Sequence, residues 1–240
     1  SLWLKQVATQ CNNQIAPPAA HSYWGLTFSP DGEYIYCVTA QLNKGDTTLS
    51  VIPVLGGPSR HLPIGPHGPV SFSPDGRSLA FIDAHLDVFQ LYVADLNGDK
   101  SRLIATRKPP EKFIDIAVGP VWSPDGDEIA CAIRKYDGQG YFDSVSAIRI
   151  ADGTERPLTS RRWSGVRQIA WLPGDAGLIV SARENAAAPF QLWQLTKSGA
   201  DVHLTNDLNE YRSVAYNAST GSVVAVQTNV VSGVWVMPSR

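Results

Sequence analysis

The pentapeptide FSPDG occurs twice in this 240-residue chain, at Phe28–Gly32 and at Phe72–Gly76, and WSPDG follows at Trp122–Gly126. Proline presets φ, aspartate can bond the backbone two residues on, and glycine adopts positive φ, so the motif predicts a tight turn after a strand. Altered copies, WLPGDAG and YNASTG, place the same aromatic position at Trp171 and Tyr216. The repeat interval is therefore 44 to 50 residues, which predicts β-propeller blades. The structural turn residues are Pro30, Asp31, Gly32, Pro74, Asp75, Gly76, Pro124, Asp125 and Gly126.

Each repeat can be divided into four strands, named a to d in chain order. Strand a ends at the aromatic residue, strand b has alternating apolar residues, and strand c ends at a Gly-containing hairpin turn. Strand d is short and polar, as expected of an outer edge. The sequence predicts one all-β propeller domain over residues 1–240 with four-stranded antiparallel blades. Its units are a partial one at 1–20 and full ones at about 21–64, 65–107, 113–160, 166–206 and 211–240.

The two ends of the chain also fit this pattern. Ser1–Gln10 resembles a strand c with its turn, Asn13–Pro18 a strand d, and the final GVWVMPSR a further strand c. Two interpretations are open: a five-blade ring with one extra strand, or part of a larger ring. Because the chain begins within a repeat, we expect it to be a processed or excised piece. An unclosed segment would expose an apolar blade face, through which homo-oligomers could form.

Composition excludes several classes of function. Apolar residues make up 43% and charged residues 18%, as in ordinary globular proteins. A net charge of −2 gives no electrostatic basis for nucleic-acid binding, and the apolar runs are too short to insert into a membrane. No signal peptide is recognisable. Cys37 and Cys131 lie in apolar runs and are expected to be buried, whereas Cys11 falls in a predicted turn that could be exposed.

The repeated FSPDG followed by an alternating strand resembles the TolB-type, WD-like β-propeller repeat over essentially the whole chain. The strings SLWLKQVAT, YWGLTFSPDG and IPVLGG are similar to propeller regions appended to bacterial membrane serine/threonine kinases or winged-helix regulators. This resemblance implies a sensor or protein-binding module and favours an extracytoplasmic location. The N-terminal domain of TolB itself has no counterpart here.

The sequence offers no catalytic motif. G-x-S-x-G, H-E-x-x-H, a P-loop and C-x-x-C are all missing, so we expect no catalytic residues, metal or cofactor. The three aspartates of the repeated turns come from different blades and cannot converge on calcium, which needs about six to eight oxygens. His85 beside Asp87 is more simply a solvated loop than a metal site. The NAS at Asn217–Ser219 is a formal glycosylation acceptor that occupies a turn.

The d–a loops, which connect successive units, are the best candidates for a binding site. They read HSYW, GPHG, KPPEKFID, SRRW and NEYR, and they differ where the rest of each unit repeats. Aromatic and arginine residues are typical of binding hot spots, although Trp24 and Trp163 could instead pack between blades. The arginines could receive an acidic ligand or remain solvated. The candidates are His21, Tyr23, Trp24, His67, Lys112, Asp115, Arg161, Arg162, Trp163, Tyr211 and Arg212.

These features predict a binding or sensor propeller that contacts a protein or small ligand at one face, within a larger bacterial protein. Two alternatives remain. One is enzymatic: a propeller capping a prolyl-oligopeptidase-like hydrolase, or a propeller that is itself an enzyme. The other is a bare repeat scaffold. A hydrolase domain in the parent gene would favour the first alternative.

Overall fold

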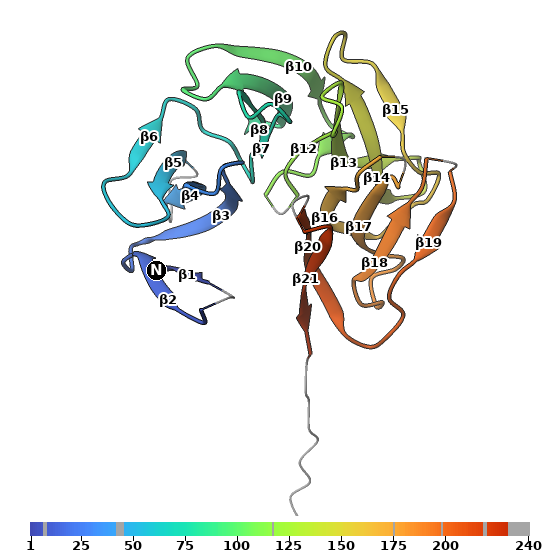
Figure 1. Cartoon of the computed structure of the whole chain (residues 1–240). Coiled ribbons are helices and arrows are strands. Elements are labelled where there is room, and N and C mark those ends of the chain that lie inside the picture. The colour runs from blue at the N-terminus through green and yellow to red at the C-terminus, as the bar shows by residue number, and fades with distance from the viewer. Residues whose placement is uncertain are drawn as a thin grey trace, which may run out of the picture.

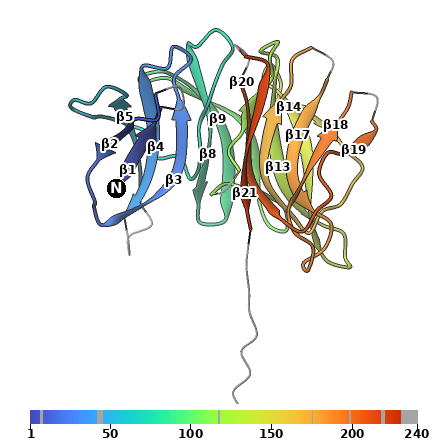
Figure 2. The ribbon, with the colours of Figure 1, turned by 60° about the horizontal axis from the view of Figure 1, so that its bottom comes forward.

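The chain folds into an arc of antiparallel β-sheets arranged like propeller blades around a common axis (Figure 1). The computed structural model describes residues 1–6, 9–41, 46–116, 118–174, 176–197, 199–217 and 220–229. All regular structure in these ranges is β, and they contain no helix that could cross a membrane. Four sheets have a full set of strands, and a two-stranded hairpin lies at each end of the arc (Figure 2).

Blades I and II each have the strand order expected of a meander, with successive strands adjacent in the sheet. Blade I consists of β3 (His21–Phe28), β4 (Tyr34–Gln41), β5 (Thr47–Pro53) and β6 (Arg60–Leu62). Blade II consists of β7 (Ser71–Phe72), β8 (Ser78–His85), β9 (Val88–Asp95) and β10 (Ser101–Arg107).

Blade III differs because its innermost strand is split into two short pieces that both pair with the same neighbour. Its strands are β11 (Lys112–Phe113), β12 (Val121–Trp122), β13 (Glu128–Tyr136), β14 (Tyr141–Arg149) and β15 (Glu155–Pro157). Blade IV is regular and contains β16 (Gly165–Trp171), β17 (Leu178–Arg183), β18 (Gln191–Leu195) and β19 (Asp201–His203).

The terminal hairpins are half-blades. The first pairs β1 (Leu2–Lys5) with β2 (Asn12–Ala16), and the second pairs β20 (Glu210–Asn217) with β21 (Ser222–Thr228). They contain the c and d strands predicted at the N-terminus and the a and b strands of the last unit. The predicted final strand c, at 233–240, and two residues of the NAS tripeptide, 218 and 219, lie outside the described residues.

The core lies between neighbouring blades rather than within one of them. The second strand of each blade is buried on both faces, as β13 shows with five consecutive buried residues. A strand covered on both faces needs an almost continuous apolar sequence, which explains why EIACAI and SLAFI lack strict alternation. Separate buried clusters fill the spaces between blades I and II, II and III, and III and IV. Cys37 and Cys131 belong to this core, as predicted.

The FSPDG segments form the predicted turns. In the first copy, the Ser29 hydroxyl donates to Asp31, and the amide of Glu33 donates to the same carboxylate at 2.9 Å. Gly32 has φ of +75°, where a side chain would be strained. The hydrogen bond from Ser29 and the one from the Glu33 amide lower the pKa of Asp31, and the other two copies repeat this arrangement. The repeated aspartates therefore serve their own turns.

Apolar side chains are exposed on the end strands of the arc. Leu26 and Phe28 in β3 are 49% and 52% exposed, and Val224 and Val226 in β21 are 62% and 54% exposed. The corresponding aromatic of blade II, Phe72, is half-buried against the core of blades I and II. The difference arises because hairpin β1–β2, the neighbour of blade I, has only the outer strands c and d and leaves the inner strand β3 uncovered, whereas blade II has a full blade on each side.

Candidate functional site

The d–a loops and the b–c turns lie at the same end of every blade, because successive strands in a meander reverse direction. This end, here called the d–a end, brings the variable loops together with the tips of the b–c hairpins. The a–b and c–d turns form the opposite end, which is occupied by the repeated FSPDG turns. The candidate residues are therefore concentrated at one end of the arc, although they come from different blades.

Trp24 and His67 from consecutive units meet at the d–a end, with ring centroids 6.0 Å apart. The Nδ1 atom of His67 lies 3.3 Å from the amide nitrogen of Ala84 and 3.5 Å from Oδ1 of Asp83. A neutral imidazole would accept from the amide, whereas a protonated one would pair with the carboxylate. This pair can therefore present an aromatic face beside the polar imidazole ring of His67.

His21 and Tyr23 form a second aromatic pair, with edge-on rings whose centroids are 5.0 Å apart. The Tyr23 hydroxyl is buried without a hydrogen-bond partner in the described part of the chain, and burial raises its pKa. Tyr23 packs on the small core cluster next to hairpin β1–β2. The pair is thus anchored in the fold as well as placed near the d–a loops.

Lys112 lies in β11, rather than in the predicted loop, and its Nζ is 5.3 Å from the ring centroid of Phe89 in blade II. It lines a hollow of about 260 Å³ together with residues of β13, β14 and the preceding loop: Pro109, Pro110, Glu111, Arg134 and Tyr141. Asp115 is only 9% exposed, so it faces the interior more than the solvent. Of these two candidates, Lys112 is the one placed to reach a ligand.

Arg161 and Arg162 already have partners within the chain. Arg161 bonds Glu184 at 3.1 Å and Asp201 at 3.1 Å, and its guanidinium carbon lies 4.4 Å from the centroid of Trp193. Arg162 forms an ion pair with Asp137, which holds the tip of the β13–β14 hairpin. Both arginines therefore serve to attach loops, and an acidic ligand would have to displace a carboxylate to bind them.

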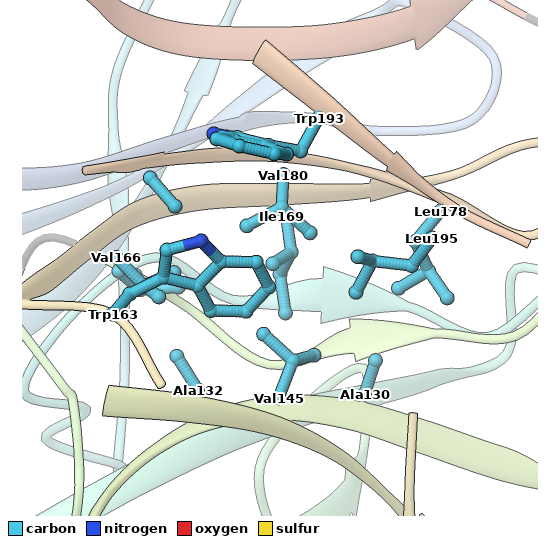
Figure 3. Packing of buried hydrophobic residues seen from close by; sticks show 12 residues of the cluster. Ala130, Ala132, Val145, Trp163, Val166, Ile169, Leu178, Val180, Trp193 and Leu195 are labelled. Atoms are coloured by element: carbon cyan, nitrogen blue, oxygen red, sulfur yellow. The ribbon is translucent and has the colours of Figure 1, made fainter. Parts of the chain in front are cut away.

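Trp163 packs between blades III and IV, which was the structural alternative for this residue. It is 1% exposed and lies among Val145, Val166 and Ile169 (Figure 3). Its backbone exchanges two hydrogen bonds with Asp143, of 2.8 and 2.9 Å. A ligand at the d–a end cannot contact this indole without opening the interface between the blades.

The last unit contributes Tyr211 and Arg212. The Tyr211 hydroxyl donates to Asp207 at 2.9 Å, which raises its pKa, and Arg212 is bonded through Nε and Nη2 to Glu210 at 3.0 Å. Sequence reasoning missed two further arginines, Arg167 and Arg183: Arg167 lies close enough to both Arg212 and Arg183 to interact with their charges. A signal was available for Arg167, because it occupies the position of Arg212 when the units are aligned on their aromatic residue.

A larger cavity of about 470 Å³ lies at the opposite end, between the turns of blades III and IV. Its wall includes the ion pair between Glu128 and Arg156. Within the described ranges, no three histidine, cysteine or acidic side chains are grouped as a metal site would require. Neither end therefore shows a grouping that could hold a metal ion among the described residues.

No protein-family model matches the chain, but individual proteins do. An uncharacterized peptidase of Bacillus subtilis, YuxL, is 38% identical over 76 residues, which are 30% of this chain and 10% of that protein. Dipeptidyl-peptidase 5 of Arthroderma otae is 26% identical over 191 residues, covering 73% of this chain and 26% of the relative. The matches thus span about a quarter or less of these relatives.

Solved structures agree on the architecture. TolB of Acinetobacter baumannii superposes with a TM-score of 0.62 and 15% identity, covering 88% of this chain and 48% of that one. An acylaminoacyl peptidase gives a TM-score of 0.52 and 14% identity, covering 80% and 33%. Such low identities establish the fold alone. The chain is accordingly similar to TolB-type β-propellers in fold, as its repeats predicted.

Proposed function

We propose that this chain is a binding or sensor propeller that receives a protein or small ligand at its d–a end, within a larger bacterial protein. The observation that carries the proposal is the set of aromatic and cationic side chains gathered there from successive blades. Trp24 contacts His67 across a blade boundary, and Lys112 reaches over Phe89 beside the 260 Å³ hollow.

The chemistry of this end suits recognition better than catalysis. Tryptophan, tyrosine and arginine dominate binding hot spots because each offers a large contact area together with a polar group. A hydrolase would need a nucleophile within hydrogen-bond reach of a base, and no serine or cysteine of the described d–a loops is bonded to a histidine side chain. The bonded pair of Ser50 and His61 lies on outer strands, 2.9 Å apart.

A ligand screen tests the proposal. We would measure the melting temperature of the purified chain against peptides and small metabolites, and then determine Kd by calorimetry. A ligand at 100 times its Kd stabilises by about 2.7 kcal/mol, which is about 5–10 °C for a chain of this size. We expect binding to weaken in Trp24→Ala and in Lys112→Ala.

The matched control is Leu55→Ala, since Leu55 is 98% exposed in a c–d turn at the opposite end. This variant should bind like the parent chain. Arg162→Ala provides a third d–a variant at an exposed position, and it tests whether the hairpin tip held by the ion pair with Asp137 contributes to binding. If the Kd of the ligands changes in Leu55→Ala and stays the same in every d–a variant, the proposed location of binding is refuted.

A second candidate function is the propeller of a longer peptidase, which the matches to YuxL and dipeptidyl-peptidase 5 favour. The full product of the gene distinguishes the two. A fluorophosphonate probe should label a serine-hydrolase domain in the peptidase case, and the present chain alone should remain unlabelled. Absence of labelling in the full product would reject this candidate.

The exposed apolar residues of β3 and β21 also support self-association through the ends of the arc. Light scattering coupled to size-exclusion chromatography measures it directly. We expect a concentration-dependent dimer that is weakened by Val224→Lys, because that side chain is 62% exposed. A monomer at all concentrations would contradict this proposal and leave the binding role unaffected.

A further inference from the structure

Three inner strands contain a β-bulge at the same register. The extra residue is Trp24 in β3, Arg167 in β16 and Arg212 in β20, each four residues before the repeated aromatic residue of its unit. A bulge redirects the side chain of its extra residue away from the ladder. The same backbone device therefore presents an indole in blade I and guanidinium groups in blade IV and the last hairpin.

The guanidinium groups of Arg167 and Arg183 share one aromatic support. Their central carbons lie 4.2 Å and 4.9 Å from the ring centroid of Phe190, which is itself 4% exposed. Gly165 makes room for this arrangement, because a Cβ there would come within 3.1 Å of the Phe190 ring and 3.2 Å of Arg183 Nε. The stack thus joins the beginning of β16, the end of β17 and the loop before β18.

Arg167 and Arg183 differ in their charge partners from the other arginines that are buried to a similar extent. The described part of the chain has five half-buried arginines: Arg107, Arg134, Arg161, Arg167 and Arg183. The first three form ion pairs with carboxylates. Arg167 and Arg183 form none with any described residue. A half-buried charge without an opposite charge is costly, and an aromatic stack offsets only part of that cost.

The hydrogen-bonding capacity of the pair is also largely unused. Arg183 donates from Nη1 to the Ala186 carbonyl at 3.3 Å, while its buried Nε has no acceptor in the described structure. No described group accepts a hydrogen bond from Arg167. Burial and the positive charges of Arg212 and Arg183 lower the pKa of Arg167, although Glu210 opposes this effect. The electrostatic potential at these guanidinium groups is therefore positive, and a bound anion would offset the repulsion between them.

We propose that Arg167 and Arg183 bind a carboxylate group of the ligand at the d–a end, between blade IV and hairpin β20–β21. A guanidinium presents its N–H donors in a planar fork that matches a carboxylate, and stacking on Phe190 leaves the edge of the fork available. The inference rests on the proposed binding function, whose ligand class it specifies. Glu210 neutralises Arg212, so two positive charges remain for the ligand.

The test observes the arginines directly. Protein labelled with ¹⁵N at arginine Nε would be titrated with succinate at constant ionic strength, and the Nε–Hε signals assigned from the variants Arg167→Lys and Arg183→Lys. We expect the signals of these two residues to shift together. Each lysine variant keeps the positive charge and loses the fork, so its affinity for succinate should fall about ten- to hundredfold.

The matched control is Arg77→Lys, since Arg77 is exposed beside an a–b turn at the opposite end. Its replacement should leave the affinity unchanged. Backbone amide spectra of all variants establish that they are folded, and two independent lysine variants keep the test valid if one fails to fold. Absence of shifts, equal shifts at Arg77, or inorganic phosphate binding as tightly as succinate would each overturn the carboxylate assignment.

Two sources of the carboxylate are distinguished by parallel titrations with glucuronate, a sugar acid, and with acetyl-Ala-Glu-amide, an acidic peptide. Whichever of these two compounds binds with the lower Kd identifies the source of the carboxylate. If neither these compounds nor succinate binds, but screened ligands still depend on Trp24, the carboxylate site fails and the binding function stands. If no ligand depends on any d–a residue, the proposed function itself fails.

Discussion

Replacing Glu155 by glutamine should destabilise the junction between blades II and III. Glu155 in β15 accepts hydrogen bonds from Lys135 Nζ and Ser146 Oγ, both at 2.8 Å, and forms an ion pair with Arg107 of the neighbouring blade. Both donors use the same oxygen, Oε1, so the amide oxygen of glutamine can keep these two hydrogen bonds at nearly unchanged volume, but its NH2 group then replaces the oxygen that faces Arg107. The substitution leaves the two cations without their shared negative charge.

The size of the effect follows from how deeply the three groups are buried. The side chains of Arg107, Lys135 and Glu155 are 17%, 24% and 23% exposed, so they lie between a surface pair, worth about 0–1 kcal/mol, and a buried pair, whose disruption costs about 3–5 kcal/mol. We expect Glu155→Gln to lower the free energy of unfolding by about 2 kcal/mol. The melting temperature should fall by about 4–8 °C.

The pH dependence gives an independent check. Burial alone would raise the pKa of Glu155, but the hydrogen bonds from Lys135 and Ser146 and the charges of Lys135 and Arg107 outweigh it and lower the pKa. A carboxylate with a lowered native pKa stabilises the fold above its unfolded pKa of about 4.3. That contribution disappears as pH falls through the native value. Urea unfolding from pH 7 to pH 3 should therefore show the parent and variant converging in acid.

Glu184→Gln is the control, because the side chains of Glu184 and its partner Arg161 are 55% and 38% exposed. Its effect should stay below about 1 kcal/mol. The double variant Arg107→Gln/Glu155→Gln should be less destabilised than the sum of the single variants, since the two residues interact. A loss below about 0.5 kcal/mol for Glu155→Gln, or a loss that does not change with pH, would refute the inference.

Two further predictions concern other parts of the fold. Gly177→Ala should be strongly destabilising, because φ is +82° and the new Cβ would lie 1.9 Å from a backbone oxygen. Gly174→Ala in the same turn has φ of +59° and open space around the new Cβ, so it should lower the free energy of unfolding by only about 1 kcal/mol. Chemical denaturation compares the two variants, and equal losses of stability would contradict the steric argument. Cys11 is exposed, while burial raises the pKa of Cys37 to about 11 and also raises that of Cys131, so a thiol reagent at pH 8 should modify one thiol quickly in the native chain and three in denaturant. More than one fast thiol in the native chain would be inconsistent with that burial.

The repeat allowed much of the architecture to be predicted from sequence. Each FSPDG or WSPDG turn depends on residues close in the chain, so local chemistry was sufficient to place it. The half-blades at both ends of the arc follow from the same alignment. The innermost strands were harder, because pairing there depends on contacts across blades. In blade III the predicted strand before Trp122 is reduced to two residues, and a separate piece at Lys112–Phe113 continues it.

The candidate site was predicted only in outline. The sequence indicates which loops vary, but it does not indicate which arginines find a carboxylate within the chain. Arg161 and Arg162 looked available and are paired, whereas Arg167 and Arg183 looked like ordinary strand residues and are unpaired among the described residues. The partners of Arg161 lie 23 and 40 positions away, so only the folded arrangement brings them together.

The bulge position shows how a repeat can hold different chemistry in each blade. Trp24, Arg167 and Arg212 share it, but the same position in blade II is Gly68, where a Cβ would come 1.9 Å from the Asp115 carbonyl oxygen. Close packing against blade III therefore removes the side chain there. The d–a end consequently has an aromatic region at blade I and a cationic region at blade IV, separated by blades II and III, where the same position is Gly68 and the buried Val118. A ligand that made the same contact with every blade around the axis would not fit this surface. A ligand with an apolar group at one end and a carboxylate at the other would fit it.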